Sequence, residues 1–302
     1  MRYSKRKTFA MRIGYVGSQY FGYQHQKGKE DIKTVEGDLK KILGGVVYGA
    51  GRTDRGVHAI SQVVCFITGS KDILKNNQVR IDLNGQKEED YYLSLVRNSE
   101  AFKQGRLNAY SCYRVPRKFN SRSSATWRRY LYLFPLNNGI YKFENFGSFD
   151  LDIDFANTML KQIEGKELPY DAFTFGDSKD QGLGLRDLCT IYRGKASVLD
   201  IGNENFVMCI ELVGSRFLRR MVRILVGTLA RGAHDPTSSS ATLLYDICMS
   251  KDRSKTAVAL PGEALCLAGV GYDPNDLAIY KFMPKKKYNE VMEELLIKKN
   301  VV

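Results

Sequence analysis

Long apolar runs are absent from this 302-residue sequence. No run approaches the roughly 20 residues that a helix needs to cross a bilayer, so we expect no membrane partner. Paired cysteines are absent too, because the six cysteines are scattered singly and none has the spacing of a zinc site: Cys65, Cys112, Cys189, Cys209, Cys248 and Cys266. We expect reduced core cysteines in an intracellular protein, in the cytosol, the nucleus or an organelle matrix.

Histidines and nucleotide-binding motifs are scarce as well. The three histidines, His25, His58 and His234, form no i, i+4 zinc pair and have no adjacent acid. The G-x-x-x-x-G-K-[ST] pattern does not occur, and Gly49 and Gly51 lack the third glycine of a dinucleotide site. These absences give little support to a zinc protease, a hydrolase with a Ser-His-Asp triad or a nucleotide-binding enzyme.

Acidic residues are few relative to basic ones. The sequence has 33 Asp and Glu against 46 Lys and Arg, which gives a formal net charge of +13. A surplus of this size attracts polyanions, so charge alone would allow RNA, DNA or acidic membrane as a partner, although we expect no membrane partner. A lysine-rich surface that serves solubility is the alternative. No helix-turn-helix or zinc pattern supports a DNA-binding module.

Hydrophobic periodicity predicts a mixture of strands and helices. We expect strands at 8–16, 61–68, 106–116, 125–134, 205–214 and 263–273, and helices at 34–44, 152–165, 241–251 and in the tail at 281–300. The polar segment 69–90 is predicted to be a surface insertion. Since several neighbouring strands lack an intervening helix, the pattern favours an α+β protein with a mainly antiparallel sheet.

A further helix is predicted at 215–233. Its apolar residues recur at helical spacing from Leu218 to Leu229 and form a stripe that faces the core. The other side of this helix would carry four arginines, which are Arg216, Arg219, Arg220 and Arg223. Because four like charges on one face repel one another, this face is a candidate for binding phosphates.

The stretch GAGRTDRGVHA, residues 49–59, gathers three glycines, two arginines, an aspartate and a histidine. Asp54, between Arg52 and Arg55, could form a turn, supply the counter-charge of a phosphate cradle, or act as a nucleophile. A carboxylate that a nearby guanidinium keeps ionised is a competent nucleophile or base. The residues alone leave these alternatives open, and we expect His58 to be structural.

The GRTDRGVHA stretch closely resembles the signature of the TruA-type pseudouridine synthases, G-R-T-D-[AK]-G-V-H-A. Four more blocks resemble that family in the same order: YVGSQYFGYQ with TVEGDL, FNSRSSATWRRYLY, FLRRMVRILVG and EALCLAGVGYD. The resemblance covers about residues 11–273. The chain departs from the pattern at Tyr23, Arg55, Ser123 and Cys266, and these changes bear on target choice more than on chemistry.

The resemblance implies an enzyme that isomerises uridine to pseudouridine in RNA, usually tRNA, with neither metal nor organic cofactor. It implies two ferredoxin-like (RRM-like) halves with a mainly antiparallel central sheet around a basic RNA-binding cleft. We expect a basic tail at 1–8, an N-terminal half with the catalytic loop at 9–118, a C-terminal half that completes the active site at 119–273, and a basic extension at 274–302.

The resemblance also implies roles for single residues. Asp54 would be the nucleophile, Arg223 its partner, and Tyr130 the ring that stacks on the base and relays the C5 proton. Substrate contacts would come from Arg52, Arg55, Leu265, Arg216, Arg219 and Arg220, with Arg52 entering the RNA and Leu265 walling the base pocket. A catalytically inactive paralogue that serves as an RNA-binding scaffold or ribosome-assembly factor is the alternative, and homodimerisation stays open.

Overall fold

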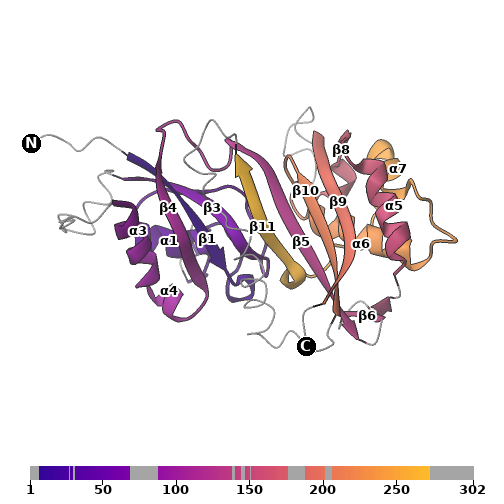
Figure 1. The fold of residues 1–302 in the computed structure, drawn as a ribbon, viewed down its shortest axis with the longest axis horizontal. Helices are drawn as coiled ribbons and strands as arrows, with labels where there is room; N and C mark the ends of the chain where they lie inside the picture. The colour runs from indigo at the N-terminus through magenta and orange to yellow at the C-terminus, as the bar shows by residue number, and fades with distance from the viewer. Residues whose placement is uncertain are drawn as a thin grey trace, which may run out of the picture. The chain divides into compact units, whose positions relative to one another are not determined.

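The structure is a computed structural model that describes residues 7–26, 28–29, 31–68, 88–137, 140–143, 147–149, 151–175, 188–200 and 206–272. The described residues form two compact units (Figure 1). Among the described residues, the first unit combines those up to Thr126 with those from Leu267 to Tyr272, and the second runs from Trp127 to Cys266. Within the described ranges, no helix is both long and apolar enough to span a membrane.

An antiparallel sheet forms the frame of the first unit. Strand β1 (Lys7–Tyr15) lies between β3 (His58–Thr68) and β4 (Leu107–Val115), and the short β2 (Val47–Gly49) pairs with β3. β11 (Leu265–Tyr272) is next to β3 in the strand order. Most residues of β1 and β3 are buried, including polar ones such as Ser61 and Gln62.

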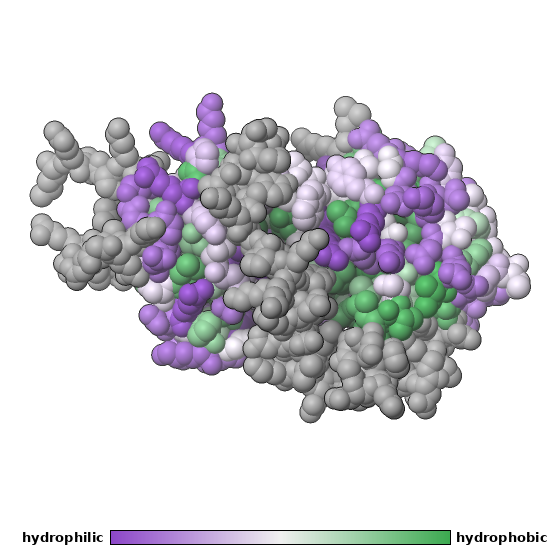
Figure 2. Space-filling model, in the orientation of Figure 1, coloured by the Kyte–Doolittle hydropathy of each residue, from purple (hydrophilic) through white to green (hydrophobic). Residues whose placement is uncertain are grey.

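Three helices accompany this sheet, α1 (Val35–Leu43), α3 (Glu88–Arg97) and α4 (Glu100–Lys103). Thr34 caps α1 by accepting a hydrogen bond from the Gly37 amide at 3.2 Å, and α1 ends at Gly44, whose φ is 68°. Figure 2 shows hydrophilic residues gathered over the part of the first unit where α3 and α4 lie. The helices therefore pack apolar side chains inward and carry charge outward.

The strands of the second unit also pair antiparallel. β5 (Ala125–Asn137) pairs with β10 (Phe206–Gly214), β10 with β9 (Leu188–Asp200), and β9 with β8 (Glu167–Pro169). The strands β6 (Ile140–Phe143) and β7 (Gly147–Phe149) extend β5 as a small hairpin. Three helices pack together beside β9, which are α5 (Ile153–Ile163), α6 (Met221–His234) and α7 (Leu243–Ser250) (Figure 1).

The predicted α+β class is confirmed, and every strand pair with a described register is antiparallel apart from one isolated bridge. The six predicted strands are present, and all six cysteines are buried and unbridged. The two ferredoxin-like halves, the basic cleft and the domain boundaries stay predictions. The N-terminal tail as far as residue 6, most of the polar insertion and the chain from 273 onward lie outside the described residues.

The arginine-rich helix begins later than the sequence predicts. α6 starts at Met221, and Arg220 is its N-cap with φ 60° and ψ 4°. A left-handed residue cannot continue a right-handed helix, so Arg216 and Arg219 lie in the loop before α6. The prediction of four arginines on one helix face is therefore wrong, and of the four only Arg223 lies in α6.

Candidate active site

The loop between β2 and β3, residues 50–57, carries three of the predicted site residues. Arg52 and Arg55 are exposed, and Asp54 between them is half-buried. The Val57 amide donates to the Asp54 carbonyl at 3.2 Å, and Gly56 has a φ of 84°, which closes a tight turn after the aspartate. The turn leaves Asp54 in the loop between two exposed arginines.

A buried glutamine holds the start of this loop. Gln62 is fully buried, and its Nε2 donates to the Gly51 carbonyl at 2.7 Å while its Oε1 accepts from the Gly51 amide at 3.3 Å. The Ala50 amide donates to the Val63 carbonyl at 2.8 Å. A side-chain amide that satisfies both backbone groups of one residue fixes the chain there, since breaking either bond would leave a buried polar group unpaired.

The segment that follows β1 braces the middle of the loop. The Tyr15 hydroxyl and Thr53 Oγ1 lie 2.8 Å apart, and the Tyr23 amide donates to the Thr53 carbonyl at 3.0 Å. The Gly17 amide donates to Nδ1 of His58 at 3.3 Å, which supports the predicted structural role of this histidine. Three separate contacts thus hold the backbone on both sides of Asp54.

Two glycines allow this close approach. Gly22 has a φ of 97°, and a β-carbon there would stand 3.2 Å from the Thr53 carbonyl oxygen and 3.3 Å from the Arg55 nitrogen. A β-carbon at Gly17 would overlap the backbone carbonyl of Val57. Both positions need glycine because the backbone of the loop 50–57 occupies the space of a side chain.

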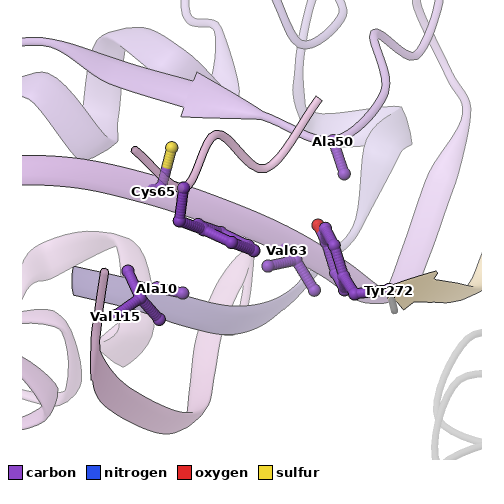
Figure 3. Packing of buried hydrophobic residues seen from close by; sticks show 7 residues of the cluster. Ala10, Ala50, Val63, Cys65, Val115 and Tyr272 are labelled. Atoms are coloured by element: carbon purple, nitrogen blue, oxygen red, sulfur yellow. The ribbon is translucent and has the colours of Figure 1, made fainter. Parts of the chain in front are cut away.

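An apolar cluster lies where the loop leaves the sheet. It comprises Ala10, Ala50, Val63, Cys65, Val115, Phe119 and Tyr272. Figure 3 shows Tyr272 beside Val63, on the same side of the cluster as Ala50. Ala50 is therefore anchored by packing as well as by its hydrogen bond.

Ser121 links this cluster to the loop. It is fully buried, its Oγ donates to the Tyr48 carbonyl at 2.6 Å, and its amide contacts Cys65 Sγ at 3.3 Å. The Tyr272 hydroxyl in turn donates to the Ser121 carbonyl at 2.8 Å. The segment after β4 and the end of β11 thus both support the strand from which the Asp54 loop emerges.

An aromatic side chain stands next to Arg55. Its guanidinium carbon lies 4.5 Å from the ring centroid of Phe21, and this ring is 49% exposed. Cation–π contact holds the arginine beside the loop instead of leaving it to move freely in solvent.

In the second unit, the predicted Tyr130 lies on β5. Its ring is only 7% exposed and makes an edge contact with Phe217, with centroids 5.1 Å apart and planes at 82°. Two residues along the strand, the Tyr132 hydroxyl donates to the Pro261 carbonyl at 3.0 Å. Burial raises the pKa of Tyr132 well above its usual value, while the positive charge of nearby Arg223 acts in the opposite direction.

Arg223, in the first turn of α6, is tied to the segment that leads into β11. Its Nε donates to the Leu260 carbonyl, and the Leu260 amide donates back to the Arg223 carbonyl at 3.3 Å. Leu265, at the end of the same segment, is 5% exposed. Because Tyr132 also bonds this segment, the structure brings β5, the start of α6 and the residues before Leu265 together.

The predicted site residues thus fall into two groups, each positioned within its own unit. Arg52, Asp54 and Arg55 share one loop of the first unit, whereas Tyr130, Arg223, Leu265, Arg216, Arg219 and Arg220 belong to the second. The pairing of Asp54 with Arg223 or Tyr130 stays a prediction. The sequence analysis missed the supporting roles of Gln62 and Ser121: Gln62 lies in none of the family-like blocks, and Ser121 lies in FNSRSSATWRRYLY without being singled out.

Comparison of the sequence with known proteins agrees with the resemblance described above. A family model described as "tRNA pseudouridine synthase" matches residues 172–273. Proteins named "tRNA pseudouridine synthase A" from Thermosipho africanus, Brachyspira hyodysenteriae and Borrelia hermsii are similar over nearly their whole length. The first is 32% identical over 277 residues, covering 86% of this chain and 98% of that protein. The second is 29% identical over 264 residues, covering 84% of this chain and 93% of that protein. The third is 29% identical over 279 residues, covering 88% of this chain and 100% of that protein.

The similarity spans both units and includes the loop that carries Asp54, because it covers more than four fifths of the chain. The mainly antiparallel α+β fold and the match to the family model agree with this extensive sequence similarity. The chain therefore belongs to the TruA-type tRNA pseudouridine synthase family.

Proposed function

We propose that the chain isomerises uridine to pseudouridine in tRNA, with Asp54 as the nucleophile. The observation that carries this proposal is the half-buried carboxylate of Asp54, in a loop that hydrogen bonds and packing brace on both sides. A nucleophile must be held in place to gain from proximity, and a turn that served structure alone would not need to display a carboxylate between two exposed arginines. The names of the relatives support tRNA as the substrate.

The chemistry needs no external reactant. The Asp54 carboxylate would attack C1′ of the ribose, or the base itself, and the N1–C1′ bond would break with its electron pair passing to the uracil. The uracil would then turn, a C5–C1′ bond would form, and the carboxylate would be released. C5 loses its proton and N1 gains one, so atoms and charge balance over the cycle.

A uridine inside an RNA helix cannot present its glycosidic bond to a side chain. Flipping it out costs a few kcal/mol of unstacking. We propose that Arg52 enters the space beside the flipped base and that Tyr130 stacks on it, which returns roughly 1–3 kcal/mol. Since Tyr130 is 7% exposed, the arriving base must move neighbouring side chains to reach the ring.

Arg223 and Leu265 would complete the site. The guanidinium of Arg223 would keep Asp54 ionised and oriented, and the Leu260 carbonyl that accepts from its Nε would aim it. Leu265, buried at the end of the same segment, would form the apolar wall against which the uracil turns. Arg55, Arg216, Arg219 and Arg220 would contact the RNA backbone.

The test is Asp54→Asn, which preserves the shape of the side chain and its capacity to close a turn. We expect pseudouridine formation to disappear in a single-turnover assay with an unmodified tRNA transcript, because a neutral amide cannot form the covalent intermediate. The melting temperature and tRNA affinity should stay close to those of the wild type. Asp90→Asn, the same change at an exposed helix position of the first unit, is the matched control.

Substantial pseudouridine formation by folded Asp54→Asn protein would remove Asp54 from the mechanism. A wild-type protein that binds tRNA but modifies none of the tRNAs tried would instead favour the alternative function, an RNA-binding scaffold without turnover.

A further inference from the structure

Three arginines of the second unit surround one exposed aromatic ring. Phe175 is 40% exposed, and the guanidinium carbons of Arg219, Arg220 and Arg253 lie 5.4, 3.9 and 5.8 Å from its ring centroid. We call these four residues the Phe175 arginine cluster. They come from three segments of the chain, so the arrangement is a product of the fold and not of a local run of basic residues.

Backbone contacts hold the three segments in register. The Thr174 hydroxyl and the Phe175 amide both donate to the Arg219 carbonyl at 3.2 Å, which fixes the ring beside the loop before α6. The 3₁₀ turn Arg253–Lys255 packs against the 3₁₀ turn that ends at Phe173. The ring is therefore positioned by the same bonds that position two of its arginines.

The nearby carboxylates are paired with lysine side chains. Asp171 lies 3.8 Å from Lys251, and Asp252 accepts from Ser254 and lies 3.9 Å from Lys255. Over the described part of the chain, Arg219, Arg220 and Arg253 form no ion pair with an acidic side chain. All three positive charges lie within about one Debye length (~8 Å) of the ring, so their fields add and favour an anion that bridges them.

The backbone at Arg220 gives a further reason to look for a ligand. Its φ of 60° is one that glycine adopts at no steric cost and that residues with a β-carbon rarely adopt. An arginine at such a position is unfavourable for the backbone. Its side chain lies 3.9 Å over the Phe175 ring, at the centre of the cluster.

We propose that the Phe175 arginine cluster is a binding site for phosphodiester groups of the RNA backbone, with Phe175 as the residue that positions the arginines. A guanidinium binds phosphate oxygens through paired N–H donors, whereas a stacked base would have to displace Arg220 from the ring. The identification of RNA rests on the proposed function. Phe175 and Arg253 are the members of this site that no sequence motif indicates.

The test compares tRNA binding by full-length variants over a range of salt concentrations. We expect Arg220→Gln and Arg253→Gln each to weaken binding of an unmodified tRNA transcript roughly tenfold, as for one lost charge-assisted hydrogen bond. Each should also flatten the slope of log affinity against log salt by about 1. KM should rise while kcat at saturating tRNA stays unchanged. Arg193→Gln is the matched control, because this exposed arginine of the same unit is already paired with Glu211 at 3.3 Å.

Three further variants separate positioning from folding. Phe175→Ala should weaken tRNA binding, and Phe175→Trp should restore it, since tryptophan is the strongest cation–π partner. Arg220→Gly should lower tRNA affinity while the melting temperature stays the same or rises, because glycine tolerates the local φ. If Arg220 served stability alone, Arg220→Gly would lower the melting temperature and leave tRNA affinity unchanged.

Unchanged salt slopes, or an equal loss in Arg193→Gln, would overturn the proposal. A second result would also overturn it. In that result, inorganic phosphate at matched ionic strength raises the melting temperature of the wild type but not of Arg220→Gln, while the two proteins bind tRNA with equal affinity. The cluster would then bind free phosphate and not the RNA backbone. A wild type without synthase activity whose cluster variants still lose tRNA affinity would refute the proposed function and leave this site standing. An active wild type with unaffected cluster variants would refute the site alone.

Discussion

Replacing Gly22 by alanine tests whether the loop 50–57 is held by the segment it packs against. Gly22 bears no chemical group, and its φ of 97° places its missing β-carbon against the backbone on both sides of Asp54. In Gly22→Ala the new methyl group would stand 3.2 Å from the Thr53 carbonyl oxygen and 3.3 Å from the Arg55 nitrogen. These atoms belong to a braced backbone, so the loop must shift by a few tenths of an ångström or more.

The magnitude follows from two separate contributions. The positive φ costs a residue with a β-carbon about 1–2 kcal/mol. Pressing a methyl group into packed backbone costs about 1–3 kcal/mol more. We expect the free energy of unfolding of Gly22→Ala to fall by about 2–5 kcal/mol. A shift of Asp54, the proposed nucleophile, should slow pseudouridine formation roughly 10- to 100-fold, since a misplacement of about 1 Å can cost 100-fold.

Gly105→Ala is the control for the backbone contribution. Gly105 also has a positive φ, 67°, but a β-carbon there would meet nothing within 4 Å. It should lose about 1–2 kcal/mol of stability and keep its single-turnover rate. Urea unfolding and the single-turnover assay on a tRNA transcript measure the two quantities. Equal rates for both variants would refute the reasoning that Gly22 acts on the position of Asp54.

Two predictions concern buried groups. Tyr272→Phe removes the hydroxyl that donates to the Ser121 carbonyl and should lower the free energy of unfolding by about 1–3 kcal/mol; no change on urea unfolding would mean that this bond contributes nothing. Burial raises the pKa of Cys209 and of Cys248 to about 12, so their thiols stay neutral in the folded state. Because the unfolded thiols ionise more readily than the folded ones, the free energy of unfolding keeps its full value below the unfolded pKa of about 8.5. It decreases as the pH rises from there toward 12. Melting temperatures should therefore fall steadily over that interval, and a constant value would contradict the burial of these thiols.

Strong local signals made several elements predictable. α1 shows its boundaries in Thr34 and Gly44, which act as the cap and the stop that their residue types favour. β5 was predicted at 125–134 and is observed at Ala125–Asn137, with the rings of Tyr130 and Tyr132 both buried. Where cap chemistry or a two-residue period is clear, the local sequence determines the element.

Other elements depend on tertiary contacts that a local pattern does not show. β9 was not predicted, partly because Gly194 interrupts it, yet a β-carbon there would stand 3.0 Å from Leu160 of α5, so the glycine permits close packing of helix on sheet. The start of α6 was placed six residues too early because hydrophobic spacing alone cannot reveal the left-handed conformation of Arg220.

The same limit applies to the site. The motif around Asp54 stands out in the sequence because its glycines, arginines and aspartate are adjacent. Gln62 supports that loop through Gly51, which is 11 residues away in sequence. Ser121 supports it through Tyr48, which is 73 residues away. Each is a common polar residue whose role comes only from where the fold buries it.

The position of β11 has a consequence for the order in which the protein folds during synthesis. The first unit contains β1 and β3 from the start of the chain, but its apolar cluster also needs Tyr272. All of Trp127–Cys266 must be translated in between, which takes on the order of ten seconds at usual rates of synthesis. The described part of the second unit comes from one stretch of sequence and can fold while the first still lacks its last strand. The strand that carries the Asp54 loop should thus be among the last parts of the newborn protein to become fully packed.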